Sequence, residues 1–150
     1  MEVRRLVEGL RPPSLDELGL GGALRQAIQR VSAGTGLAVD LVVGDLPALP
    51  AAVEVAAFRI ATEAVANVVR HAGATTCQVS VARSDGRLEV RVTDDGRGIG
   101  SGDHPGHGLH TMRERAEELR GRFSVASGPG TTVVAELPLA PWPRTALATP

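Results

Sequence analysis

The stretch "EVRVTDDGRGIG", Glu89 to Gly100, runs from a strand pattern into a glycine-rich loop. Apolar and polar residues alternate as far as Val92, and glycine occupies every second position after the paired aspartates Asp94 and Asp95. Glycine has no side chain, so bare backbone beside a carboxylate can approach another group closely. The stretch therefore predicts a strand that ends at a tight turn, at a metal-binding loop or at the wall of a ligand pocket.

Two hairpins frame this stretch. Residues 75–84 and 87–94 alternate in period two around Asp85-Gly86, which is a hairpin signature. Residues 123–127 and 131–139 repeat the pattern around Gly-Pro-Gly. We further expect a strand at 37–43 and helices at 1–10, 20–32, 51–72 and 109–120. Ser14 and Glu17 have the spacing of a capping box, and Gly121 should close the last helix. A glycine-rich loop is expected at 96–107. This order predicts an α+β fold, with helices packed on one face of a mainly antiparallel sheet.

Composition narrows the possible functions. The chain has 150 residues, 43% of them hydrophobic and 22% charged, which fits one globular domain. Its formal net charge of -1 gives no field that would recruit nucleic acid or a membrane. Every basic residue is arginine, which excludes a P-loop lysine, and the single cysteine, Cys77, excludes an internal disulfide. There is no long apolar run, so we expect a cytoplasmic domain without direct membrane contact.

The helix at 51–72 carries the first candidate constellation. Glu63, Asn67 and Arg70 or His71 are spaced so that they share one helix face. Asparagine is a poor residue for a helix interior, and a carboxylate and an amide oxygen one turn apart suit Mg²⁺. Arg70 and His71 could contact a polyphosphate. The alternative is an ordinary solvated polar face.

Asp94 is the second candidate. A carboxylate at a strand end can accept a hydrogen bond from an exocyclic amine such as the 6-amino group of adenine, whereas the carbonyl of guanine would be repelled. A plain glycine-rich turn is one alternative. A calcium loop is another, but the acidic residue and flanking helices of an EF-hand are missing.

The third candidate is the pair Gly106 and Gly108, which precede the last helix. Free N–H groups at a helix start favour phosphate, although a flexible loop would look the same. His104, His107 and His110 have no acidic or cysteine partner at fixed spacing, which favours solvated histidines over a metal site.

Taken together and in this order, these segments resemble the N, G1 and G2 boxes of the ATP-binding domain of sensor histidine kinases, a Bergerat fold, over about residues 51–139. The resemblance implies a two-layer α/β sandwich that binds ATP and Mg²⁺. For catalysis, it implies Asn67 as the metal ligand and Glu63 and Asn67 as catalytic residues. For the base, it implies Asp94 as the carboxylate that specifies adenine, Gly96 and Gly98 beneath the ring, and Thr131 at the adenine end. Gly106 and Gly108 would belong to a lid, and the further nucleotide contacts would be Arg70, His71, Ile99, His107 and Leu109.

Two longer runs point to a subfamily. Residues 6–28, "LVEGLRPPSLDELGLGGALRQAI", look like the end of a dimerisation helix and its connector, and residues 108–121 are similar to a G-[LM]-x-x-M-x-E-R run. Both features are found in nitrate/nitrite-sensor and membrane-fluidity-sensor kinases. We therefore expect a remnant of the dimerisation helix and connector at 1–22, the ATP-binding domain at 23–140, a disordered tail at 141–150, and a short lid that is poorly ordered without ATP.

The resemblance implies a protein-histidine kinase that presents the γ-phosphate of Mg-ATP to a histidine on a dimerisation domain. None of the four histidines lies in an acceptor motif of that family, so we expect either an excised catalytic fragment or a kinase-like protein that lacks its own acceptor. In both cases we expect the chain to be monomeric and unable to phosphorylate itself. A response regulator would be a partner only through the parent kinase. The alternatives are an anti-sigma-factor serine kinase of the same fold and a nucleotide-binding interaction module.

Overall fold

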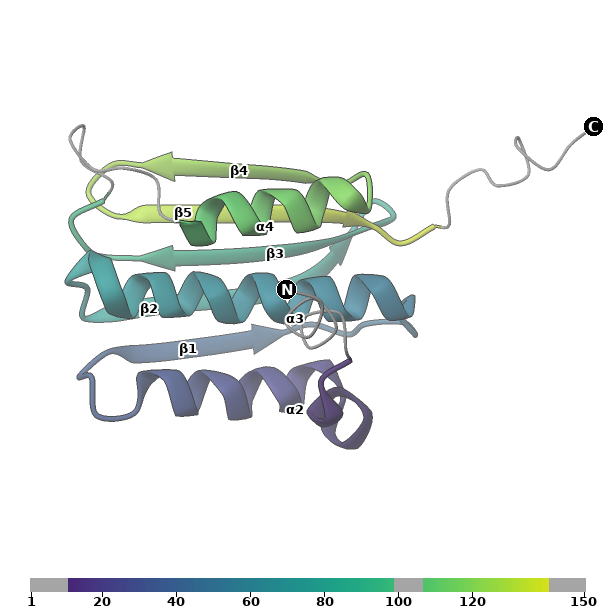
Figure 1. Cartoon of the computed structure of the whole chain (residues 1–150), viewed down its shortest axis with the longest axis horizontal. Coiled ribbons are helices and arrows are strands. Elements are labelled where there is room, and N and C mark those ends of the chain that lie inside the picture. The colour runs from purple at the N-terminus through teal and green to yellow at the C-terminus, as the bar shows by residue number, and fades with distance from the viewer. Residues whose placement is uncertain (1–10, 99–106, 141–150) are drawn as a thin grey trace, which may run out of the picture.

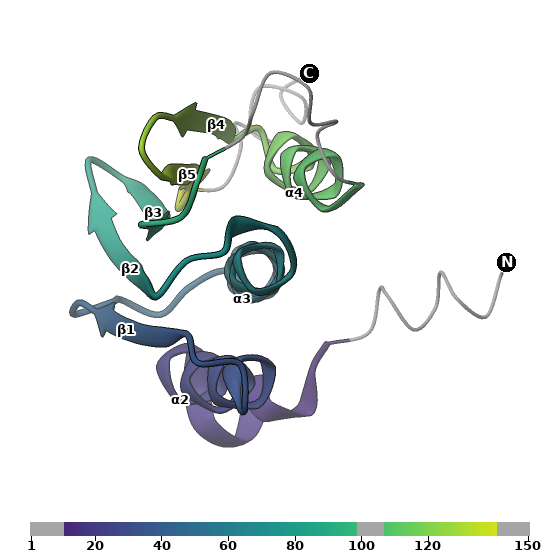
Figure 2. The same ribbon diagram turned by 90° about the vertical axis from the view of Figure 1, so that its left-hand side faces the viewer.

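The computed structural model describes residues 11–98 and 107–140. Within them, three helices, α2 (Pro13–Ser32), α3 (Ala51–Asn67) and α4 (His107–Glu118), cover one face of a five-stranded sheet (Figures 1 and 2). The strands are β1 (Ala38–Val43), β2 (Thr76–Ser84), β3 (Arg87–Asp94), β4 (Arg122–Ser127) and β5 (Thr131–Pro138). The predicted α+β sandwich is confirmed.

The sheet has the strand order β1-β2-β3-β5-β4. β1 pairs with β2 in parallel, and the other three pairings are antiparallel. Both predicted hairpins are present as β2–β3 and β4–β5. Asp85 and Gly86 turn the first hairpin with φ values of 51° and 73°, as a two-residue turn of this kind requires.

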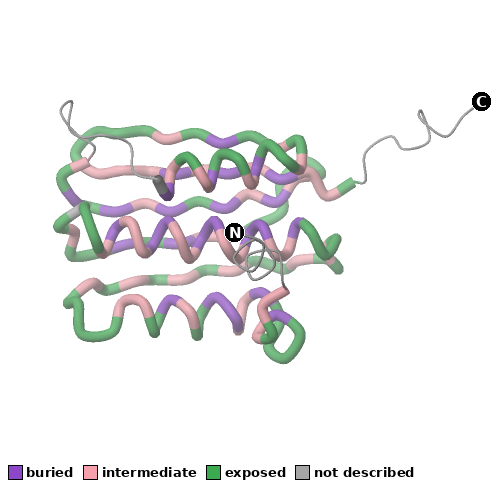
Figure 3. Tube along the Cα trace, in the orientation of Figure 1, coloured by how far each residue is buried: buried purple, intermediate pink, exposed green. Residues whose placement is uncertain are grey.

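The core lies between the helices and the sheet. Burial alternates along β2, β3 and β5 (Figure 3), with Val79, Val90 and Ala135 among the buried residues. Successive side chains of a strand point to opposite faces, so the buried set faces the helices. Ile60 and Val65 of α3 are fully buried against them. α3 therefore runs across the middle of the sheet (Figure 1).

The helix predicted at 51–72 changes character at its end. α3 stops at Asn67, and Val68–Ala72 forms a π-helical turn, η1, in which the Val68 N–H is shared between the carbonyls of Ala64 and Val65. Gly73 then takes a left-handed conformation, with φ of 62°, and terminates the helix. Wide turns of this kind often occur at functional sites.

The starts of two helices, α2 and α4, also differ from those predicted. α2 begins at Pro13, and no side chain caps it, because Ser14 and Glu17 already lie inside the helix. Gly19 (φ 72°, ψ 174°) breaks it into two pieces, which explains why the regular pattern starts only near Leu20.

α4 starts at His107, two residues earlier than predicted, so Gly108 lies inside its first turn. Arg120 takes the left-handed position (φ 61°) after α4, and Gly121 closes the helix by donating its N–H to Ala116 O at 2.8 Å. The helix predicted at 1–10, the loop 99–106 and the tail 141–150 lie outside the described residues. None of the helices described is both long and apolar enough to cross a membrane.

Candidate functional site

One end of the sheet collects most of the residues selected from the sequence. The end of α3 with η1, the start of β2, the end of β3, the β4–β5 turn and the start of α4 all lie at the left-hand end of Figure 1. These segments are far apart in the sequence. The fold thus brings the described members of the three candidate constellations to one end of the sheet.

Asp94 is the last residue of β3 and is the one buried charged side chain in the described part of the chain, 7% exposed. Its Oδ1 accepts a hydrogen bond from Gly96 N at 2.8 Å, which fixes the carboxylate against the loop that follows. In the strand register Asp94 lies between Cys77 on β2 and Thr131 on β5. Thr131 is therefore placed directly beside Asp94.

Two glycines allow the backbone to close around this carboxylate. A Cβ on Gly130 would collide with the main-chain carbonyl of Asp94. Gly98 has φ of 76°, and a Cβ there would come within 2.6 Å of Gly128 O and 2.9 Å of Ser127 Oγ. The loop after β3 is therefore packed against the β4–β5 turn, and side chains larger than hydrogen have no room there.

Burial also affects Cys77, which is in register with Asp94. Desolvation, together with the charges of Asp94 and Asp95, raises the pKa of the thiol to about 12. The thiol is therefore protonated at neutral pH, as expected for a structural core residue.

Side chains of α3 and η1 form the second part of the site. Arg70 Nη2 donates to Glu63 Oε2 at 2.9 Å and to Asn67 Oδ1 at 2.7 Å. The side chains of Arg70 and Glu63 are 50% and 35% exposed, so this pairing is accessible to solvent. A Cβ on Gly108 would contact the Glu63 carboxylate and would lie 3.1 Å from Asn67 Oδ1, which places the start of α4 against the same two side chains.

This arrangement fits a hard cation. The oxygens of Glu63 and Asn67 already converge on one positive charge, that of Arg70. A carboxylate and an amide oxygen are suitable ligands for Mg²⁺, which keeps waters and phosphate oxygens as its others. No group of three or more His, Cys, Asp or Glu side chains that could hold a metal occurs within 11–98 and 107–140.

Two residues that the sequence reasoning did not select connect these parts. Asp95 accepts hydrogen bonds from the main-chain N–H groups of Thr75 and Thr76, both at 2.9 Å, and from Thr75 Oγ1 at 2.8 Å. These bonds hold the pKa of the Asp95 carboxyl well below its usual range. Arg97 Nε donates to His71 O at 3.0 Å. The doubled aspartate at 94–95 is the signal that could have revealed this role, because neighbouring strand residues point in different directions.

The remaining predicted contacts are less defined. His71 is exposed and contributes its carbonyl to the bond with Arg97. Leu109 is partly buried and packs against the core. Gly96 is buried beside Asp94. Ile99 and Gly106 lie outside the described residues, and for His107 the structure gives only its place at the start of α4.

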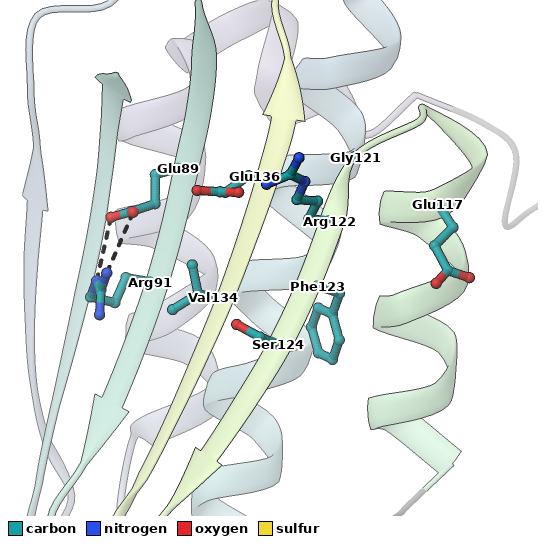
Figure 4. Close-up of a pocket in the computed structure, with 9 residues that line it drawn as sticks. All are labelled: Glu89, Arg91, Glu117, Gly121, Arg122, Phe123, Ser124, Val134 and Glu136. Carbon is teal, nitrogen blue, oxygen red and sulfur yellow. Dashed lines mark hydrogen bonds and ion pairs between the residues drawn. The ribbon is translucent and has the colours of Figure 1, made fainter. Parts of the chain in front are cut away.

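A separate hollow lies on the β4 side of the sheet (Figure 4). It has a volume of about 560 Å³ and is lined mainly by outward-facing residues of β3, β4 and β5, including Val134 and Ser124. Glu89 and Arg91 pair with each other at its border, 3.3 Å apart. None of the residues selected from the sequence lines it, so we do not assign the nucleotide site there.

Comparison with known proteins gives a consistent result. Residues 52–141 match the family described as histidine kinase-, DNA gyrase B-, and HSP90-like ATPase. The chain is 37% identical over 144 residues to the sensor histidine kinase MctS of Rhizobium johnstonii, covering 91% of this chain and 31% of MctS. It is 36% identical over 140 residues to the histidine-protein kinase/phosphatase UhpB of Salmonella typhimurium, covering 91% of this chain and 28% of UhpB.

Among solved structures, the blue-light activated histidine kinase EL346 of Erythrobacter litoralis is similar, with a TM-score of 0.68 and 25% identity. The match covers 77% of this chain and 39% of that protein. The chain thus spans well under half the length of each of these three relatives.

Proposed function

Because the chain belongs to the histidine kinase-, DNA gyrase B-, and HSP90-like ATPase family and is homologous to the ATPase domains of sensor histidine kinases, we propose that it binds Mg-ATP. In this proposal the chain presents the γ-phosphate of ATP to a histidine of a dimerisation domain. The observation that carries the proposal is the meeting of a buried strand-end carboxylate, Asp94, with the Glu63–Asn67–Arg70 cluster at one edge of the sheet.

Asp94 selects adenine in this proposal. One of its oxygens is held by Gly96 N, so the carboxylate is oriented before the ligand arrives. Its Oδ2 would accept a hydrogen bond from the 6-amino group, and guanine offers a carbonyl there instead. Gly96 and Gly98 would lie beneath the base, and the Thr131 hydroxyl would support it from β5, where Thr131 neighbours Asp94.

Glu63, Asn67 and Arg70 handle the phosphates. Asn67 would hold Mg²⁺, and Glu63 would orient the ion or its waters. When bound, Mg²⁺ neutralises charge on the phosphate oxygens and keeps them aligned for transfer. Arg70 would release Glu63 and Asn67 and pair with the polyphosphate, which its exposed position allows. Backbone N–H groups at the start of α4, near Gly108, would contact the phosphate chain.

Transfer itself then requires mainly positioning and charge stabilisation. An imidazole nitrogen of the acceptor attacks the γ-phosphorus, the bond from this phosphorus to the bridging oxygen breaks, and ADP leaves. The acceptor histidine would lie on the dimerisation domain, and a response regulator would be a partner only through the parent kinase.

A phosphotransfer assay in trans tests the proposal. The chain would be incubated with Mg²⁺ and γ-labelled ATP together with the histidine-bearing dimerisation domain of a relative such as MctS. We expect label on the partner that acid removes, as for a phosphohistidine, and no label with Asn67→Ala. Arg91→Ala, which breaks an ion pair at the hollow on the β4 side, away from the proposed site, is the control and should transfer normally.

Other results would point elsewhere. Acid-stable label on the serine of an anti-sigma antagonist protein would establish the serine-kinase alternative, which the named histidine-kinase relatives do not favour. Failure to bind ATP at millimolar concentration would contradict the proposal and leave a nucleotide-independent interaction module.

A further inference from the structure

Asp94 and the Glu63–Asn67 pair must grip opposite ends of one ligand if the proposed function holds. Asp94 belongs to β3, whereas Glu63 and Asn67 belong to α3. Along the chain, the end of α3 is separated from the end of β3 by η1 and the whole β2–β3 hairpin. Something must therefore fix the end of the helix relative to the end of the strand.

The contacts of Asp95 and Arg97 bridge this gap. Asp95 receives three hydrogen bonds from Thr75 and Thr76, the residues through which η1 enters β2, and its own N–H donates to Thr76 O at 3.2 Å. Arg97 donates to His71 O, a carbonyl at the end of η1. A cationic side chain there also complements the negative end of the helix dipole.

These residues stand directly beside the adenine-binding candidates. Asp95 lies between Asp94 and Gly96, and Arg97 lies between Gly96 and Gly98. Asp94 and Gly96 are buried while Asp95 and Arg97 are exposed, so buried residues of the proposed adenine site alternate with residues that tie the stretch to the helix end. The same five residues thus perform two tasks.

We propose that Asp95 and Arg97 are positioning residues that clamp the helix end to the strand end, and so set the separation between the adenine-binding and phosphate-binding parts of the site. The proposal rests on the proposed nucleotide function. A ligand that reaches both parts gains because, once one part is bound, the second engagement is intramolecular. A ligand that reaches only one part gains nothing from the clamp.

This difference provides the test. Wild type, Asp95→Ala and Arg97→Ala would be titrated with Mg-ATP, which reaches both parts, with adenosine, and with magnesium pyrophosphate, using NMR shifts for the weak ligands. We expect Asp95→Ala to weaken Mg-ATP binding by about tenfold, in line with a partial loss of effective concentration. Adenosine and pyrophosphate should bind within twofold of wild type. Arg97→Ala, which removes one bond, should show the same pattern with a smaller loss.

Three further variants complete the design. Asp95→Asn keeps an acceptor oxygen for both main-chain N–H groups and should restore most of the Mg-ATP affinity. Thr75→Val removes only the bond from Thr75 Oγ1 and keeps the test usable if Asp95→Ala does not fold. Asp40→Ala removes an exposed strand aspartate on β1 and should change nothing.

The outcomes separate the clamp from the function. Equal losses for all three ligands, or no loss for any, would overturn the clamp while ATP binding by the wild type stands. Absence of ATP binding in the wild type would instead contradict the proposed function itself.

Discussion

The parts of the site that we propose to bind adenine and phosphate are built differently, and we call them the adenine end and the phosphate end. At the adenine end, Asp94 is 7% exposed and is held by backbone on both sides, with the main chain near Gly130 touching its carbonyl. At the phosphate end, Arg70 is 50% exposed and is joined to Glu63 and Asn67 through side chains alone. Buried backbone contacts fix a position, whereas exposed side-chain pairs can exchange partners. We infer that the first part selects the ligand and the second adapts to it.

The largest effect on binding is expected from Asp94→Asn. The amide replaces a charged acceptor, and losing a hydrogen bond to a charged group costs about 1.5–3 kcal/mol, or roughly 10–150-fold in affinity. Calorimetric titration with ATP measures the loss, and Asp40→Asn, on β1, controls for a change of charge alone. Binding within twofold of wild type would show that Asp94 does not contact the base.

Gly130→Ala should damage the adenine end through its backbone. A methyl group there collides with the Asp94 carbonyl, and overpacking of this kind costs about 1–3 kcal/mol of folding stability. Gly121→Ala, at the far end of α4, creates a similar collision with Glu136 O and should cost a similar amount. Urea unfolding and ATP titration together separate the two, because only Gly130→Ala should weaken ATP binding. Equal loss of ATP affinity in both variants would contradict a local role for Gly130.

Arg70→Ala should leave folding almost unchanged. Exposed ion pairs contribute about 0–1 kcal/mol, so the midpoint of urea unfolding should hardly move. ATP should bind several-fold more weakly and adenosine as in wild type. Arg91→Ala, whose side chain is 47% exposed and also paired with a glutamate, is the matched control. A loss of adenosine binding in Arg70→Ala would mean that the two parts are not distinct.

The smallest effect near neutral pH concerns Cys77. Its pKa is raised from 9.0 to about 12, so the folded state holds the thiol proton more tightly than the unfolded state. The stabilisation is complete well below pH 9 and is lost as the pH rises toward 12, by about 1–2 kcal/mol at pH 10. Urea unfolding at pH 8 and pH 10 should show this extra loss in wild type but not in Cys77→Ala. An identical pH dependence in both proteins would argue against burial of the thiol.

Much of the fold follows from the sequence because its signals are local. Alternation and the Asp85-Gly86 pair predict the first hairpin, and the turn angles agree. Helix ends are harder to predict from the sequence. Pro13 and Gly108 lie within the first turns of α2 and α4, and the residues around them give no helical pattern. The π turn after Asn67 depends on the packing of α3, and the periodicity of the sequence does not reveal it.

For the site, too, some features could be predicted from the sequence and others could not. Residue types single out Asp94, Asn67 and Glu63 separately, and only the resemblance to a family groups them. In the structure, the ends of β3 and α3, which carry these residues, lie at the same end of the sheet (Figure 1). Arg70 reaches Glu63 and Asn67 along the same helical segment, as their spacing predicted. The contacts of Asp95 with Thr75 and Thr76 cross the chain and depend on tertiary geometry. Their roles toward nucleotide, and the boundary predicted at residue 22, stay predictions.

The most direct test is the nucleotide preference of the wild-type chain. ATP and GTP would be titrated by calorimetry, each with and without Mg²⁺. Our account predicts that ATP binds, that Mg²⁺ strengthens the binding, and that GTP binds at least tenfold more weakly because its carbonyl faces the Asp94 carboxylate. Equal affinity for ATP and GTP would contradict the assignment of Asp94 and, with it, the account of this edge as an adenine-selective site.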